Sequence, residues 1–115
     1  MNFVELNGEN WVEEVLMTDL PVLVDFRFAT NDSDAQEDAL LEELQEEWGL
    51  RVRIGLLDAA RYPEIAGAYH ISDYSTLGMF YGGNIHYATW GSGRVKKMVL
   101  FWMKPSRPTP VRVWN

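Results

Sequence analysis

The sequence predicts an α/β domain in which a central mixed sheet of four to five strands is flanked by about four helices. Two observations indicate this fold class. Strand-like and helix-like segments alternate through the first part of the chain, and two later strand-like segments are separated by a tight-turn signal. The chain has 115 residues and an apolar fraction of 47%, which suits a single domain with one core.

The first three predicted elements are a strand, a helix and a second strand. Residues 3–6 form a short apolar run that ends at an Asn-Gly pair. Residues 9–17 place Trp11 and Val15 at helical spacing, which predicts a helix. Residues 22–26 form a nearly continuous apolar run, the pattern of a central strand that is buried on both faces of a sheet.

The next three predicted elements are a helix, a strand and a shorter helix. Residues 33–48 place apolar side chains on one side and acids on the other, and Gly49 follows as a stop signal. Residues 51–57 predict another buried strand. Residues 64–69 predict a short helix, which Pro63 opens. The alternation favours parallel strands joined by right-handed crossovers.

The last part of the chain predicts a hairpin, a helix and a tail. Residues 76–81 and 85–90 are strand-like, and the Gly-Gly-Asn sequence between them predicts an antiparallel hairpin. Apolar side chains at helical spacing predict a last helix within residues 95–103. The three prolines after it cannot continue a helix, so we expect a domain over residues 1–104 and an extended tail over 105–115.

Composition excludes several classes of function. The net charge of −7 disfavours a nucleic-acid partner, because phosphate binding needs clustered Lys and Arg. The N-terminal residues are polar and acidic where a secretory signal would be apolar, and no apolar run approaches the roughly 20 residues of a membrane span. We therefore expect a cytoplasmic protein that binds neither nucleic acid nor membrane.

The chain contains no cysteine, which is its most informative chemical feature. Its absence removes disulfide bonds, thiolate catalysis and cysteine-based zinc or iron–sulfur sites. The only two histidines, His70 and His86, fall on separate predicted elements. The sequence therefore predicts neither a metal site nor a cofactor.

An acidic segment within the second predicted helix has three interpretations. Residues 32–43 imitate a calcium-binding loop through the spacing of Asp32, Asp34, Gln36, Asp38 and Glu43. Glu37 stands where such a loop requires glycine, and side chains along a continuous helix cannot surround one ion. We expect a solvated acidic face, with a docking face for a basic partner as the alternative.

The element order and several local sequences resemble the thioredoxin family over roughly residues 3–104. Residues 22–26 resemble the family's central strand, and residues 41–48 resemble the second half of the helix that follows its active site. These two segments fix an ungapped register. In that register, the family's Trp-Cys-Gly-Pro-Cys motif is replaced by Thr30, Asn31, Asp32, Ser33 and Asp34.

The resemblance implies that the redox site has been remodelled. Asn31 and Asp34 occupy the two cysteine positions and cannot form a thiolate or a disulfide. Ser75 stands where the family has its cis-proline, which removes the reason for a cis peptide there. Asp25 resembles the family's buried acid, for which we expect a structural role. Arg27 takes the place of an active-site tryptophan.

We therefore expect a non-enzymatic, redox-inactive protein that acts as a protein–protein interaction or chaperone-like module. The resemblance and the tail composition supply the candidate partner-binding residues: Phe28, Thr30, Asp73, Tyr74, Trp90, Gly91 and Trp114. The alternative is a structural subunit of a larger assembly, docked through its tail and last helix. An enzyme with other chemistry has least support, because neither Ser33 nor Ser75 has a sequence signal for a general base.

Overall fold

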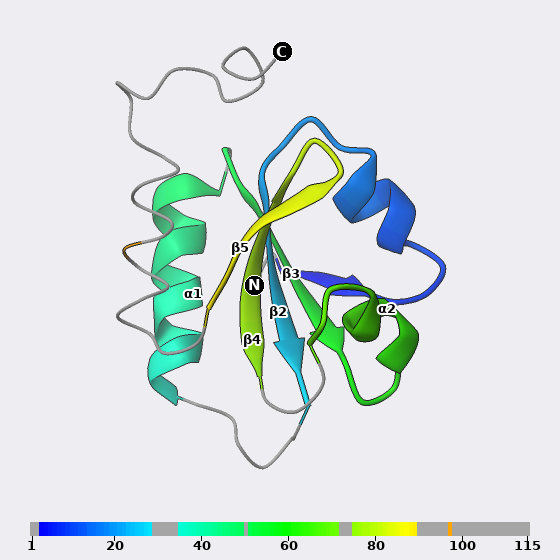
Figure 1. The fold of residues 1–115 in the computed structure, drawn as a ribbon. Helices are drawn as coiled ribbons and strands as arrows, with labels where there is room; N and C mark the ends of the chain where they lie inside the picture. Colours follow the sequence, from blue (N-terminus) through cyan, green and yellow to red (C-terminus); the bar gives the residue numbers. More distant parts are fainter. Residues whose placement is uncertain (1–2, 29–34, 50, 72–74, 90–96, 98–115) are drawn as a thin grey trace.

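The chain folds around one five-stranded sheet in the computed structural model, which describes residues 3–28, 35–49, 51–71, 75–89 and 97 (Figure 1). The described elements follow one another along the chain in this order: β1 (Val4–Leu6), η1 (Val12–Leu16), β2 (Val22–Arg27), α1 (Ala35–Trp48), β3 (Arg53–Asp58), α2 (Pro63–Ala68), β4 (Thr76–Tyr81) and β5 (Asn84–Thr89). The predicted last helix and tail lie outside the described residues, except for Lys97.

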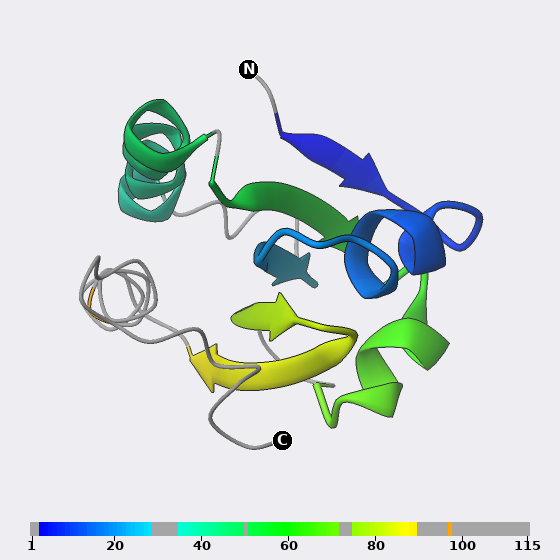
Figure 2. The same ribbon diagram turned by 90° about the horizontal axis from the view of Figure 1, so that it is seen from above.

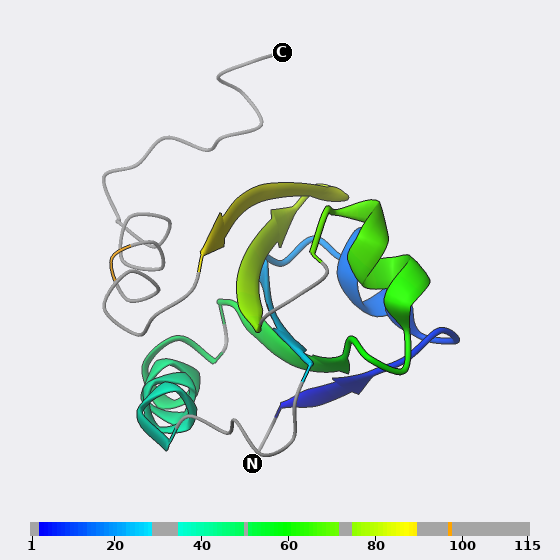
Figure 3. The same cartoon turned by 60° about the horizontal axis from the view of Figure 1, so that its bottom comes forward.

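The sheet is mixed, as the sequence predicts. Its strand order is β1-β3-β2-β4-β5, with β1, β3 and β2 parallel and with β4 and β5 antiparallel to their neighbours. Helix α1 covers one face of the sheet, and η1 and α2 cover the other (Figures 2 and 3). Within the described ranges, no helix is long and apolar enough to cross a membrane.

Strand β2 is the centre of the fold, and the prediction of a strand buried on both faces is confirmed. Every residue from Val22 to Phe26 is at most 1% exposed. Because side chains alternate along a strand, Leu23 packs under α1 whereas Val24 and Phe26 pack under η1 and α2. Strand β2 therefore joins the two halves of the core and positions Arg27 and Phe28 at its carboxyl end.

The core on the η1 and α2 face contains four aromatic rings in mutual contact. Trp11 meets Phe80 edge-on at 5.5 Å between ring centroids, and Tyr69 meets Phe80 edge-on at 5.0 Å. Phe26 lies within 6.4 Å of the other three rings. Edge-to-face pairs of this kind add stability beyond the area that they bury.

The structure corrects three predicted boundaries. Residues 9–17 do not form one α-helix, because η1 is a short helix of the wider π type that covers Val12–Leu16 only. The third strand begins at Arg53, since the N–H groups of Arg51 and Val52 still donate to the carbonyl of Trp48. Strand β5 begins at Asn84, which leaves a two-glycine turn.

That turn has the backbone geometry of a type I′ hairpin. Gly82 and Gly83 have φ values of 64° and 85°, a region that favours glycine. The predicted antiparallel hairpin is therefore confirmed, and its turn is one residue shorter than expected.

Candidate functional site

The candidate site lies where β2 and β3 end, beside the beginning of α1 and of β4 (Figure 1). The structure describes four of the residues that the sequence singles out there, namely Asp25, Arg27, Phe28 and Ser75. The other singled-out residues lie outside the described part of the chain: Thr30, Asn31, Asp32, Ser33, Asp34, Asp73, Tyr74, Trp90, Gly91 and Trp114.

Asp25 is buried, as the resemblance implies, and an arginine binds it. Its side chain is fully inaccessible to solvent, and Arg27 Nε donates to its Oδ2 at 2.5 Å. The two residues lie on the same face of the sheet because they are two positions apart in β2. A buried carboxylate needs such a partner to offset its desolvation. Sequence reasoning noted Arg27 as a substitution and missed this contact.

Arg27 also binds α1. Its Nη2 donates to Oδ1 of Asp38, so one guanidinium joins a carboxylate of the sheet to a carboxylate of the helix. The Arg27 side chain is 32% exposed and the Asp38 side chain is 45% exposed. Burial disfavours the charged guanidinium, but hydrogen bonds and charge attraction from Asp25 and Asp38 outweigh it, so the pKa of Arg27 lies above its ordinary value.

A third carboxylate lies beside this pair. Asp58 is the register partner of Arg27 on the neighbouring parallel strand β3, and it is exposed. Its Oδ1 accepts a hydrogen bond from the N–H of Arg61 at 3.3 Å. In the described part of the site, one cation thus binds two acids, and a third acid lies at the neighbouring register position, an arrangement that can hold a strand and a helix in position.

Phe28 and Ser75 connect the end of β2 to the beginning of β4. The backbone N–H of Phe28 donates to Oγ of Ser75 at 3.4 Å. The Phe28 ring is partly buried and packs against the core on the η1 and α2 face. Phe28 therefore contributes to the core as well as to the rim of the site. The peptide bond before Ser75 involves Tyr74 and lies outside the described residues, so the predicted trans bond stays a prediction.

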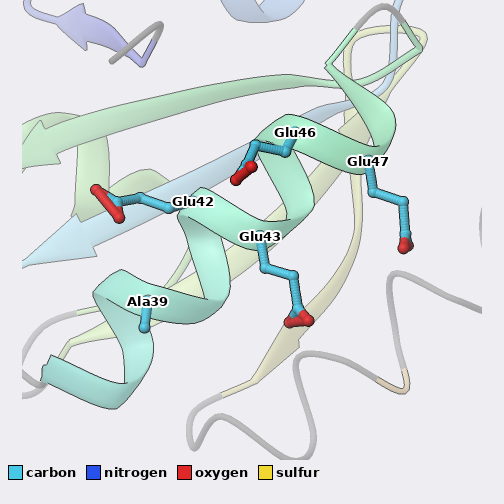
Figure 4. A pocket seen from close by; sticks show the side chains of 5 residues that line it. All are labelled: Ala39, Glu42, Glu43, Glu46 and Glu47. Carbon is cyan, nitrogen blue, oxygen red and sulfur yellow. The ribbon is translucent and has the colours of Figure 1, made fainter.

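The outer side of α1 forms a shallow acidic hollow (Figure 4). Its lining consists of Ala39, Glu42, Glu43, Glu46 and Glu47. Among the described residues, none of these four glutamates forms an ion pair with a Lys or Arg. The solvated acidic face that the sequence predicts is therefore present on α1.

The arrangement of these acids does not suit calcium. Asp38 and Glu43 lie on one regular helix, and Arg27 already binds Asp38. Figure 4 shows the four glutamate side chains diverging along the helix and not converging on one point. No group of three or more potential ligands in the described ranges could hold a metal ion. The two histidines lie on different segments, with His86 bonded to the Tyr81 carbonyl within the hairpin at 3.0 Å.

Comparison with known proteins places this geometry in context. No family model matches the chain. The chain is 26% identical over 83 residues to the chloroplastic thioredoxin M3 of Oryza sativa subsp. japonica. That match covers 72% of this chain and 47% of the rice protein, so the chain spans about half the length of the curated relative it matches.

A solved structure gives the decisive likeness. The crystal structure of the Trx4 domain of ERdj5 matches with a TM-score of 0.73, over 90% of this chain and 97% of that domain, at 16% sequence identity. This chain has the thioredoxin fold. The sequence between β2 and α1 contains the residues to which the resemblance assigns the remodelled motif, and the chain has no cysteine at any position.

Proposed function

We propose that this chain is a redox-inactive thioredoxin-fold protein that acts by binding another protein, as an interaction or chaperone-like module. The observation that supports this most strongly is the combination of a thioredoxin fold with a sequence that has no cysteine. Disulfide exchange requires an attacking thiolate and a second thiol that resolves the mixed disulfide. Neither group is available in this chain.

The contacts of Asp25 support the same proposal. A buried carboxylate that moves protons needs freedom to gain and lose a proton beside a reacting group. Here Arg27 binds Asp25 at 2.5 Å and joins it to α1. This arrangement suits a structural role for the acid.

The proposed binding surface is the end of the sheet at which β2 finishes. Its described rim includes Phe28 and Ser75. In the sequence, the candidate anchor Tyr74 comes shortly before β4, and the candidate anchor Trp90 directly follows β5. Aromatic side chains commonly supply most of the binding free energy in protein interfaces. We therefore expect these aromatic residues to dominate partner binding.

The alternative role is a structural subunit that docks through its tail and last helix. Those segments lie outside the described residues, so this role stays a prediction of the sequence. The expected location in the cytoplasm and the absence of nucleic-acid and membrane partners also stay predictions.

Two experiments test the proposal. An insulin-reduction assay with dithiothreitol should give no rate above the protein-free control, and measurable reductase activity would contradict the proposal. Crosslinking and capture should then compare the intact chain with a Tyr74→Ala/Trp90→Ala variant, with a form that ends at Lys104, and with Met17→Ser.

Each form has a defined outcome. Met17 is 75% exposed and precedes the opposite end of β2, so Met17→Ser serves as the matched control and should capture the same proteins as the intact chain. We expect the double variant to lose a partner that the control retains. Loss of that partner only in the truncated form would contradict the proposed surface and support the structural-subunit alternative.

A further inference from the structure

Helix α1 has an unfavourable charge pattern. It contains six acids and no basic residue between Ala35 and Trp48. Acids four positions apart face each other at Asp38/Glu42, Glu42/Glu46 and Glu43/Glu47, and like charges at this spacing destabilise a helix. Two glutamates also lie in the last turn, where the helix dipole favours cations. Contacts from outside the helix must therefore hold α1 in place.

Apolar packing supplies part of this attachment. Leu40, Leu41 and Leu44 are at most 8% exposed and pack on the sheet. Near the end of α1, the guanidinium of Arg51 lies over the Trp48 ring at 4.9 Å from its centroid. Among the described residues, Arg27 is the one cation that binds an acid of α1.

The geometry of Arg27 suits the attachment of a helix to a strand. Its Nε binds Asp25, which is fully buried within β2, and its Nη2 binds Asp38. The planar guanidinium can bind two carboxylates at once, which the single ammonium of lysine does less well. Asp25 thus orients Arg27, and Arg27 holds Asp38.

We propose that Arg27 is an electrostatic latch that fixes the first half of α1 to the carboxyl end of β2. When the contact between Arg27 and Asp38 breaks, that half of the helix loosens while the sheet stays folded. The neighbouring Asp58 gives the released guanidinium a second carboxylate, because it is the register partner of Arg27 on β3. In the closed latch the Arg27 guanidinium binds Asp38, and in the open latch it binds Asp58. This inference does not depend on the proposed binding function.

Amide hydrogen exchange in the intact chain measures the latch directly, because it reports local opening segment by segment. Asp38→Asn weakens the outer contact, which is partly exposed, so we expect exchange over residues 38–44 to rise by about threefold. Exchange over Arg53–Asp58 should stay unchanged. Equal acceleration in helix and sheet, or no acceleration in α1, would overturn the proposal.

Removal of Arg27 needs a paired variant. Arg27→Met alone leaves Asp25 charged and buried, so amide exchange in this variant would report the loss of global stability together with any opening of α1. Asp25→Asn/Arg27→Met removes both charges and should accelerate the same α1 amides. Adding Asp38→Asn to this pair should have no further effect if Arg27 is the group that Asp38 binds. A further acceleration would contradict the latch.

Two controls separate the latch from general charge effects. Arg53→Met removes an ion pair of similar exposure, in which Arg53 Nη1 lies 3.3 Å from Glu14 Oε1, and should leave α1 exchange unchanged. Asp58→Asn removes the carboxylate that stabilises the open latch and should slow exchange over residues 38–44, so unchanged exchange would contradict the role of Asp58. Faster α1 exchange in either control would contradict the assignment to Arg27 and Asp38.

Discussion

The hydroxyl oxygen of Ser75 accepts a hydrogen bond from the backbone N–H of Phe28 at 3.4 Å. This contact joins the end of β2 to the residue before β4. A proline, which the thioredoxin family has at this position by the resemblance, has no side-chain oxygen and could not accept it. The serine therefore gives this chain a link across the candidate site that a proline would not provide.

Ser75→Ala tests the strength of that link. The donor–acceptor distance exceeds the usual range for N–H to oxygen bonds, so we expect the free energy of unfolding to fall by less than about 1 kcal/mol. Urea unfolding measures the change. Thr18→Ala, which removes a local 3.3 Å bond to the N–H of Leu20, is the matched control. A loss of several kcal/mol for Ser75→Ala alone would contradict a weak link.

The two members of the buried ion pair should differ in their effect on stability. Arg27→Met leaves a charge on Asp25, which is fully buried, and breaking such a pair costs about 3–5 kcal/mol. Asp25→Asn leaves Arg27, which is partly exposed and still binds Asp38, so its cost should be clearly smaller. Denaturant unfolding at neutral pH gives both values. The reverse order would contradict the assignment of Asp25 as the desolvated member.

Much of the fold could be predicted from local sequence pattern. The run over residues 22–26 is apolar at nearly every position, and only a strand covered on both faces buries all of it. The two glycines before Asn84 adopt positive φ values, which few other residues tolerate. In both places the local preference and the final structure agree, so the pattern was sufficient.

The site was less predictable because its main contact is not local. Arg27 and Asp38 are eleven residues apart and belong to a strand and a helix, so no periodic pattern relates them. The helix itself contains no Lys or Arg, and the cation that binds Asp38 comes from a strand. Phe28 was interpreted as a binding residue from its position, but it also packs on the core. The sequence signal for this site was Arg27 itself, a cation two positions after the buried acid Asp25 on a predicted strand.

Alkaline pH should distinguish arginine from lysine at position 27. The pKa of Arg27 is raised further above an already high ordinary value, so its charge and the stability that it contributes persist through the accessible alkaline range. In Arg27→Lys, the paired lysine would have a folded-state pKa above its unfolded value of about 10.4. Its contribution is fully present below that value and is lost as the pH rises through the folded-state pKa.

The measurement is the difference in unfolding free energy between Arg27→Lys and the unaltered chain from pH 8 to 11. Taking the difference cancels the titration of the tyrosines, which both proteins share. We expect the gap to widen above about pH 10. A constant gap across this range would contradict a charge-based role for the side chain.

His70 closes α2 in a conformation that suits glycine. Its φ is 63°, and the N–H groups of His70 and Ile71 donate to the carbonyls of Gly67 and Ala66, the hydrogen-bond pattern of a Schellman cap. The left-handed conformation costs a residue with a Cβ about 1–2 kcal/mol, whereas glycine loses more backbone entropy on folding.

His70→Gly should therefore raise the free energy of unfolding by about 0.5–1 kcal/mol. Thermal or urea unfolding measures the gain. His70→Ala keeps the Cβ and serves as the control, so it should give little or no gain. Equal stabilisation by glycine and alanine would indicate that the imidazole and not the backbone was the source of the strain.

The last turn of α1 should accept a cation with a gain in stability. Glu47 is exposed, lies at the negative end of the helix dipole and is four positions after Glu43. Glu47→Lys replaces a repulsive pair with an attractive one and favours the dipole, so we expect a gain of about 0.5–1.5 kcal/mol at low ionic strength. Glu47→Gln removes the charge alone and should give part of that gain. Because both effects are electrostatic and exposed, the difference between the two variants should shrink in 1 M NaCl, where the Debye length is about 3 Å. A gain that is the same for both variants and insensitive to salt would show that helix propensity, and not charge, limits the stability of α1.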